Sequence, residues 1–481
     1  MTSFPRPTPV RLSAVDALSA PILRDGMGSA DDLIFVSLLR ADAARYSARY
    51  SDIVDDVPEI RLLAAAARVL MEPEAETHVD ALHHRIEESV AAAVRQRRTT
   101  SNVNMHAAGN GSGPTTRWRG DSARVQRVLD DLVAHGVPGA AATVWDAETG
   151  VHFFSSGYAD PAAARPPVID DHFRIASLTK IFVATVVLQL AAQGRLSLHD
   201  TLSRWLPHAV RGGAAITLRQ ILQHTARLPD FVDQLPQDNA SRLREYAPGE
   251  LVTLVADKPL LGLPAGTYSY SNTGFLLAGL VIEQVTGRNW RAEVRDRITT
   301  PLGLKETSTP YRETAIPRPH LTGHHFSSSG ESTGPGDDVT RLSPTMADSA
   351  GEMISDSQDL ITFARALFDG RLLPAQQLAE MTTAVPSPEP MDGYGLGLVR
   401  SDLACGTPVW GHGGKIAGFS SWLATNAEGT CVLAAVTTRI PQDTIAYYRG
   451  LINAVFAPAT TDDQASSATC NGPEASNREP S

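Results

Sequence analysis

The chain has 481 residues, of which 42% are hydrophobic and 20% are charged. This length exceeds what one hydrophobic core usually fills, and the ordinary globular composition excludes wholesale disorder, so we expect a large enzyme domain with an additional module. The 42 basic and 53 acidic residues give a formal charge of −11. No overall positive field therefore attracts phosphate backbones or an anionic membrane surface, and we exclude nucleic acid as a partner.

The cysteines and the N-terminus carry no signal for a metal site or for export. Cys405, Cys431 and Cys470 match no zinc-binding spacing. The first 23 residues lack the apolar core of a secretory signal, and no apolar run reaches the ~18 residues of a membrane span. We expect a cytoplasmic protein without a membrane span.

Residues 1–98 are predicted to form an N-terminal helical module, because apolar residues recur there at helical spacing. No set of catalytic residue types gathers in this segment, and a protein partner that docks on these helices is one hypothesis for it. Residues 99–120 are rich in Gly, Ser, Thr and Asn, which predicts a flexible linker. Residues 457–481 are poor in large apolar side chains and are predicted to be a disordered tail.

The segment 121–456 is predicted to be the catalytic domain and to belong to the α+β class. A helix opening at Ser122 precedes two strands that the hairpin turn Glu148-Thr149-Gly150 connects, and a closing helix covers 442–456. The predicted strands lie at 140–146, 151–158, 395–400, 408–410, 419–426 and 430–437. Because strands lie at both ends and helices lie between, we expect an antiparallel β-sheet built from both ends of the domain, flanked by helices and with a helical insertion.

Ser177-Leu178-Thr179-Lys180 places a hydroxyl and an amine three residues apart at the start of an apolar helical run. At that spacing the two side chains share one helix face, so the amine can reach the serine oxygen. Serine is a weak nucleophile that must lose its proton, and a buried lysine of lowered pKa can accept it. Ser177 at a helix N-terminus would also direct backbone N–H groups at developing negative charge. A Ser-x-x-Lys also arises by chance, so further signals are needed.

Two other motifs carry polar groups of catalytic type. Tyr270-Ser271-Asn272 precedes an apolar helix, and a phenol beside a lysine ammonium can lower its own pKa and shuttle protons, while Asn272 offers an amide to substrate and lysine. The competing interpretation is a tyrosine that only packs its ring. His412-Gly413-Gly414 lies between two strand-like runs, which predicts an edge strand whose glycines let the backbone approach a substrate closely.

In this order, the three motifs resemble those of the serine β-lactamase-like superfamily of penicillin-binding proteins and class C β-lactamases, and most of all its D-alanyl-D-alanine carboxypeptidase and esterase branch. The resemblance extends from about Ser122 to Phe456. Four further stretches are similar to that branch, namely GRLSLHD at 194–200, ITLRQILQHT at 216–225, YSYSNTGFLLAG at 268–279 and PLGL at 301–304.

The resemblance implies Ser177 as the nucleophile, Lys180 as the general base and Tyr270 as the proton shuttle. It also implies that Asn272 orients the substrate and the lysine, and that no metal or organic cofactor takes part.

By the same resemblance, His412 stands where other branches have the lysine of Lys-Thr-Gly, and Gly414 lies against the substrate. The backbone N–H groups of Ser177 and Lys415 would form the oxyanion hole. One departure from the family pattern is Arg227, which stands where the family usually has glycine. The resemblance therefore does not predict the backbone conformation of this turn.

We therefore expect a serine hydrolase that acts through an acyl-enzyme on an ester, amide or peptide, with a small-molecule or peptide substrate as its partner. Two alternatives stay open. One is an intracellular acyltransferase that passes the acyl group to an amine or alcohol, and the other is a non-catalytic protein that binds a peptide or β-lactam.

Overall fold

A computed structural model describes residues 120–236, 241–263, 267–325, 336–387, 391–404, 406–441 and 443–457. The chain divides into two units, Met1–Thr115 and Thr116–Ser481. The predicted N-terminal helices, most of the linker and the tail beyond Ala457 lie outside the described residues, so the domain boundaries given above remain predictions. Within the described ranges, no helix combines the length and the apolar character needed to cross a lipid bilayer.

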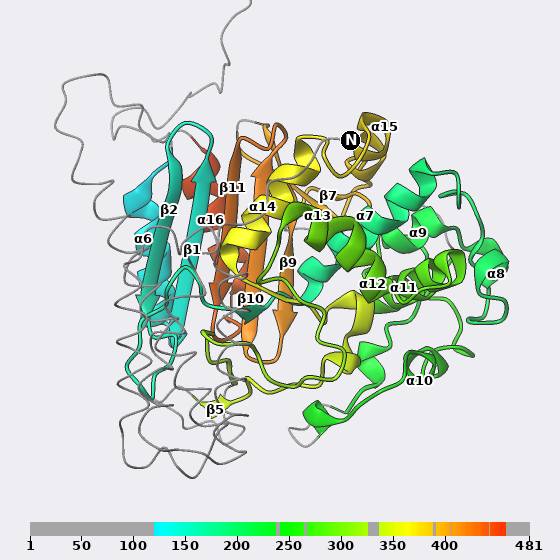
Figure 1. The fold of residues 1–481 in the computed structure, drawn as a ribbon, viewed down its shortest axis with the longest axis horizontal. Helices are drawn as coiled ribbons and strands as arrows, with labels where there is room; N and C mark the ends of the chain where they lie inside the picture. The colour runs from blue at the N-terminus through cyan, green and yellow to red at the C-terminus, as the bar shows by residue number, and fades with distance from the viewer. Residues whose placement is uncertain are drawn as a thin grey trace, which may run out of the picture. The chain divides into compact units, whose positions relative to one another are not determined.

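A seven-stranded antiparallel sheet forms the centre of the fold (Figure 1), in the order β2-β1-β11-β10-β9-β8-β7. The strands are β1 (Gly139–Asp146), β2 (Gly150–Gly157), β7 (Gly393–Tyr394), β8 (Val399–Asp402), β9 (Pro408–Ile416), β10 (Phe419–Asn426) and β11 (Cys431–Thr437). Ala140 of β1 faces Thr437 of β11 in the register. The first and last strands of the domain are therefore neighbours, which confirms that both ends of the segment build one sheet.

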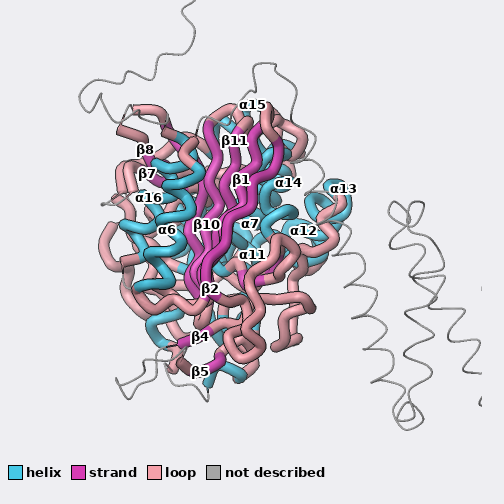
Figure 2. Tube along the Cα trace, turned by 90° about the vertical axis from the view of Figure 1, so that its left-hand side faces the viewer, coloured by secondary structure: helices cyan, strands magenta, loops and turns pink. Residues whose placement is uncertain are grey.

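Helices cover both faces of this sheet, and Figure 2 shows α6 (Ser122–Ala134) and α16 (Thr444–Phe456) on one of them. Their apolar residues, including Leu129 and Leu451, pack with the facing side chains of the sheet in one buried cluster. The opposite face carries α14 (Ser357–Phe368) and α7 (Thr179–Ala192) within the larger apolar core. The α+β class with flanking helices is thus confirmed.

The segment between β2 and β7 supplies the helical insertion. Its remaining helices are α8 (Leu202–Trp205), α9 (Leu218–Leu222), α10 (Pro248–Thr253), α11 (Asn272–Thr286), α12 (Trp290–Val294), α13 (Thr300–Leu302) and α15 (Ala375–Met381). Two small sheets pair β3 (Phe173–Arg174) with β6 (Ile354–Ser355) and β4 (His324–His325) with β5 (Asp337–Asp338). The short turns used below are η3 (Ala176–Leu178), η5 (Val232–Gln234) and η9 (Asp348–Ala350).

Helix α7 is apolar on every side, because its sequence TKIFVATVVLQLAA has no polar stripe. A helix of this kind is stable only inside a core, and all but three of its residues are buried. The Ser177-Leu178-Thr179-Lys180 motif at its N-terminal end is therefore attached to one of the most completely enclosed elements of the domain.

The prediction that His412-Gly413-Gly414 lies on an edge strand is wrong. Strand β9 is flanked by β10 on one side and by β8 on the other, and β7 forms that edge of the sheet. The predicted strand 395–400 is instead two short strands, β7 and β8, separated by a turn in which Gly397 has φ +78°. Pairing with β8 covers only Pro408 to Gly411 of β9, so the glycine motif lies just beyond the end of β8.

Candidate active site

Ser177 lies in the 3-10 turn η3, directly before α7 begins at Thr179. The preceding residue, Ala176, has φ +49°, a left-handed conformation that costs a non-glycine residue roughly 1–3 kcal/mol. Strained backbone of this kind persists where the surrounding structure holds it. The turn directs the Ser177 hydroxyl toward the side chains of Lys180 and Tyr270.

Lys180 is fully buried, and three oxygen atoms surround its ammonium group. Its Nζ lies 3.0 Å from Ser177 Oγ, 2.8 Å from Asn272 Oδ1 and 2.6 Å from the Ala350 carbonyl oxygen. Burial lowers the pKa of Lys180 to about 7, although the Asp230 carboxylate raises it in part. A large fraction of Lys180 is therefore neutral near pH 7 and able to accept a proton.

The Tyr270 hydroxyl lies 2.9 Å from Ser177 Oγ, so the serine oxygen has partners in both Lys180 and Tyr270. Although 37% of the Tyr270 surface is exposed, dehydration around its hydroxyl raises the pKa of Tyr270 above its ordinary value, and the hydrogen bond with Ser177 offsets only part of this. The lowered pKa that the sequence predicted from the nearby lysine is wrong, because burial outweighs that effect. Tyr270 therefore rests as a neutral phenol that can donate a proton.

Asp230 is a site residue that the sequence argument missed. Its Oδ2 accepts hydrogen bonds from the backbone N of Asn272 at 3.0 Å and from Asn272 Nδ2 at 2.8 Å. These bonds turn Asn272 Oδ1 toward Lys180. Nothing near Asp230 in the sequence marks it, because its partner lies 42 residues along the chain.

His412 is buried on β9, and both of its ring nitrogens have partners within the protein. Nδ1 lies 2.5 Å from the Gly413 carbonyl oxygen, which can only accept, so Nδ1 carries the proton. Nε2 lies 2.9 Å from the Tyr394 hydroxyl and then accepts from it. Burial and the charge of Lys180 lower the pKa of His412 to about 3. The ring is neutral, and Tyr394 is a second residue that the sequence argument missed.

His224 packs beneath the tyrosines of the site, with ring centroids 4.2 Å from Tyr270 and 4.7 Å from Tyr394. Its Nδ1 accepts from the backbone N of Ser271 at 3.2 Å, and it is one of the few non-glycine residues with positive φ, at +56°. His224 was visible in the sequence only inside a family-like stretch. Its contacts suit it to hold the Tyr270 segment in place.

Gly414 brings β9 against η3, the turn that carries Ser177. A Cβ atom at this position would lie 2.3 Å from the Ile175 carbonyl oxygen and 2.4 Å from Ser421 Oγ, so only glycine fits. Ser421 Oγ donates to the same Ile175 oxygen at 2.9 Å. The next residue, Lys415, is exposed on the same strand. This contact places β9 against the turn η3. The oxyanion-hole roles of Ser177 and Lys415 stay predictions.

Arg227 keeps the turn geometry that its position demands. It adopts φ +57°, the left-handed conformation that favours glycine. Its Nη2 donates to the Leu261 carbonyl at 2.6 Å, and the Leu261 N donates back to the Arg227 carbonyl at 2.8 Å. The arginine thus adopts the strained turn and ties it to the loop that leads to Tyr270.

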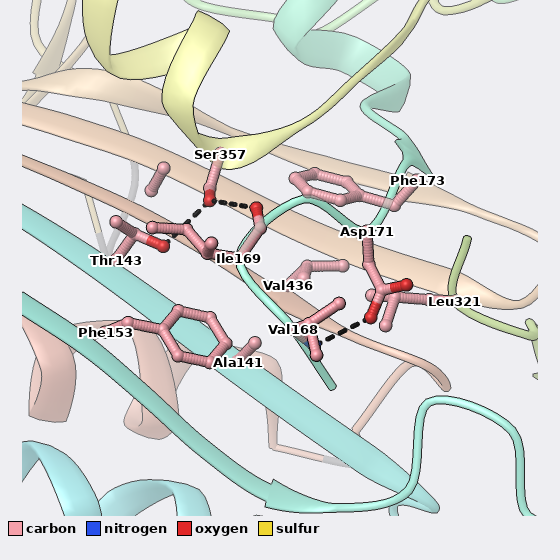
Figure 3. Close-up of a pocket in the computed structure, with 11 residues that line it drawn as sticks. Ala141, Thr143, Phe153, Val168, Ile169, Asp171, Phe173, Leu321, Ser357 and Val436 are labelled. Atoms are coloured by element: carbon pink, nitrogen blue, oxygen red, sulfur yellow. Dashed lines mark hydrogen bonds between the residues drawn. The ribbon is translucent and has the colours of Figure 1, made fainter. Parts of the chain in front are cut away.

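A small cavity on the sheet lies apart from this site (Figure 3), and none of the residues that line the cavity belongs to the site. Its free space of about 10 Å³ holds at most one water molecule. Thr143 Oγ1 donates to Ser357 Oγ at 2.8 Å, and Ser357 Oγ donates to the Ile169 carbonyl at 3.3 Å. The cavity is therefore too small for a substrate. Among the described residues no cluster of His, Cys, Asp or Glu could hold a metal ion.

Comparison with known proteins gives matches that cover about two-thirds of the chain. The Beta-lactamase family model matches residues 125–452. A D-stereospecific amidohydrolase from Streptomyces sp. has a solved structure that is 39% identical, with a TM-score of 0.64, over 70% of this chain and 99% of that one. The D-amino acid amidase of Ochrobactrum anthropi is 28% identical, with a TM-score of 0.62, over 69% and 98%. Penicillin-binding protein 4 of Amycolatopsis lactamdurans is 29% identical over 66% of this chain and 85% of its own length.

Proposed function

This chain belongs to the beta-lactamase family, and on that premise we propose that it is a serine hydrolase that cleaves amides of D-configured amino acids through an acyl-enzyme on Ser177. The observation that carries the proposal is that Ser177 Oγ lies within hydrogen-bond distance of both Lys180 Nζ, at 3.0 Å, and Tyr270 OH, at 2.9 Å. Ser177 Oγ, the proposed nucleophile, therefore contacts both a base that can be neutral and a neutral proton donor.

In the acylation step, neutral Lys180 takes the proton of Ser177 while Oγ attacks the substrate carbonyl carbon. Negative charge develops on the carbonyl oxygen, and in this proposal the backbone N–H groups of Ser177 and Lys415 stabilise it. The carbon–nitrogen bond then breaks, and the Tyr270 phenol protonates the leaving amine. Lys180 returns a proton to Tyr270, which leaves an ester on Ser177 and the starting protonation states.

Deacylation repeats these steps with water as the nucleophile. As water adds to the ester carbonyl, its proton passes to the Tyr270 oxygen while the phenol proton passes to Lys180. The Lys180 ammonium then protonates Ser177 Oγ as it leaves, which restores the starting protonation states. An amine or alcohol in place of water would give the transferase that the sequence left open, so this alternative becomes an outcome of the experiment below.

The substrate class rests on the neutral His412 and on the relatives. His412 provides no positive charge, because both ring nitrogens are used within the protein. In branches of the family that have lysine at this position, the side chain provides a positive charge. The neutral His412 provides none, and this disfavours substrates whose carboxylate must bind there, such as β-lactams. The solved relatives include a D-stereospecific amidohydrolase and a D-amino acid amidase. A neutral amide with a D-configured acyl part fits both observations.

The test is intact-mass detection of acylation with matched D- and L-amino acid amides and esters, β-lactams and a serine-directed phosphonate. We expect labelling by the phosphonate, turnover of the D-amides, and neither reaction in a correctly folded Ser177→Ala variant. Equal turnover of D- and L-amides would refute the stereochemical part. Labelling that persists in Ser177→Ala would place the nucleophile elsewhere, and products that change as amine or alcohol acceptors are added would favour the transferase.

A further inference from the structure

A buried ion cluster that the proposed mechanism does not use lies behind the catalytic lysine. It consists of Arg291, Asp348 and Glu352, together with the indole of Trp290. Arg291 donates from Nε to Glu352 Oε1 and from Nη2 to Glu352 Oε2 and Asp348 Oδ2. Trp290 Nε1 donates to Asp348 Oδ1 at 3.0 Å. The three charged side chains are each less than one-tenth exposed.

Such a cluster is not explained by stability alone. Buried ion pairs lose most of their Coulombic gain to desolvation, and well-packed apolar residues often replace them without loss. Asp348 also has φ +43°, a strained conformation for a residue with a side chain. The cluster therefore holds a short segment, residues 348–352, in a conformation that the segment would not adopt by itself.

That segment contacts the catalytic machinery directly. The Ala350 carbonyl oxygen lies 2.6 Å from Lys180 Nζ. Met353, the residue that follows this segment, donates from its backbone N to Thr179 Oγ1, beside Lys180, at 3.2 Å. The Met353 carbonyl accepts from the N of Ile175 at 3.0 Å.

The same segment is tied to the helix that presents Asn272. Ser349 Oγ donates to the Phe275 carbonyl of α11 at 3.0 Å. Only a glycine fits opposite it, because a Cβ at Gly279 would lie 2.3 Å from Ser349 Oγ. The two oxygens that face Lys180 are Asn272 Oδ1, on α11, and the carbonyl oxygen of Ala350, in the segment 348–352. The hydrogen bond from Ser349 joins this segment to α11.

The two carbonyl oxygens decide where the lysine lone pair points. A neutral amine has two N–H donors and one lone pair. The oxygens of Asn272 and Ala350 can only accept, so they take the two N–H groups. The lone pair is then left facing Ser177 Oγ, which is the arrangement that proton abstraction needs. Displacement of the Ala350 carbonyl would let the amine rotate.

We propose that Arg291, paired with Asp348 and Glu352, is a positioning residue that fixes the Ala350 carbonyl against Lys180 and so aims the lysine lone pair at Ser177. The inference rests on the proposed function, because it assumes that Lys180 is the base for Ser177. The Arg291 side chain donates its hydrogen bonds to Glu352 and Asp348, and it acts on Lys180 only through the segment that they belong to.

The test measures the rate of phosphonate labelling of Ser177 against pH in Arg291→Lys and Glu352→Gln. Both variants keep side chains of similar length, and lysine keeps the charge while losing the planar fork. We expect a fall of at least tenfold at the pH plateau. We also expect the acid limb to move to lower pH, because the Lys180 ammonium loses an acceptor. Both variants leave unchanged the charged or titratable groups that face Lys180, which are Asp230, His224, His412 and Tyr270.

The control is Arg295→Met, which removes an exposed arginine just beyond α12 and should label like the wild type. If Arg291→Lys and Glu352→Gln only lower the melting temperature, and label per folded molecule at the wild-type rate with the wild-type pH profile, the positioning role is overturned. A wild-type protein that the phosphonate never labels would overturn the proposed function, which distinguishes the two failures.

Discussion

Replacing Asp230 by asparagine should lower the pKa of Lys180 without removing any atom that contacts Ser177. Asp230 Oδ2 accepts two hydrogen bonds from Asn272, and Asn272 Oδ1 accepts one from Lys180. Asparagine keeps the size of the side chain and one accepting oxygen, but it removes the negative charge. That charge opposes the effect of burial on Lys180, whose pKa is about 7 with Asp230 in place.

The size of the shift follows from the path between the two charges. The hydrogen bonds at either end of the Asn272 amide are each 2.8 Å long, and the amide spans roughly 2–3 Å, so the charges are at most about 8 Å apart. At an effective dielectric constant of about 20 this separation corresponds to ~2 kcal/mol, or about 1.5 pKa units, and solvent at the site mouth reduces it toward about 1. Because a carboxylate favours the ammonium form, its removal lowers the pKa.

The assay is the pH dependence of kcat/KM for an activated ester, or of phosphonate labelling, from pH 4.5 to 9. In the wild type we expect the rate to fall below about pH 7 as Lys180 becomes protonated, and in Asp230→Asn we expect that limb about one unit lower. Asp233→Asn is the matched control, since Asp233 is an exposed carboxylate of the adjacent turn η5 and should leave the limb in place. An unmoved limb in Asp230→Asn, or a limb at higher pH, would refute the electrostatic reasoning.

Four other outcomes are expected. Lys180→Arg should label almost as slowly as Lys180→Ala, because guanidinium stays protonated and cannot act as a base; near-normal turnover would contradict the base role. The free energy of unfolding should rise between about pH 7 and pH 10. The folded pKa of Lys180 is lowered from 10.5, so the unfolded chain binds more protons than the folded chain in that window. Lys180→Met should remove this contribution in denaturant titrations. Gly414→Ala should abolish labelling, because its Cβ would lie 2.3 Å from the Ile175 carbonyl oxygen. Gly413→Ala should label within a few-fold of the wild type, because its Cβ would meet the Trp422 ring at 3.4 Å, an ordinary contact distance. A chain that begins near Thr115 should stay monodisperse and label at the full rate, and aggregation or lost labelling would show that the preceding residues complete the domain.

The sequence allowed most of the fold and part of the site to be predicted, because those features depend on short-range signals. Two strand-like runs joined by the hairpin turn Glu148-Thr149-Gly150 predicted β1 and β2 within one residue of their ends. Ser177 and Lys180 are three residues apart on one continuous turn and helix, so their contact follows from local geometry.

The edge-strand prediction failed because short strands carry little pattern. Strands β7 and β8 have two and four residues, and the turn at Gly397 separates them. A run of six residues cannot show from its composition that it folds back on itself. The sequence therefore did not show that β8 pairs with Pro408 to Gly411 of β9.

The sequence by itself determined which reactive groups the chain contains and which of them are close along it, namely the hydroxyl of Ser177, the amine of Lys180, the Tyr270–Asn272 pair and the glycines after His412. Only the tertiary structure decided the protonation states of these groups and the direction in which each of them points. Residue type sets an ordinary pKa, but burial lowers the pKa of Lys180 to about 7 and raises that of Tyr270. The Ala350 carbonyl that faces the lysine is a backbone atom found in every residue, so no sequence pattern marks it, and it reaches Lys180 across 170 residues because the packed core brings the two segments together.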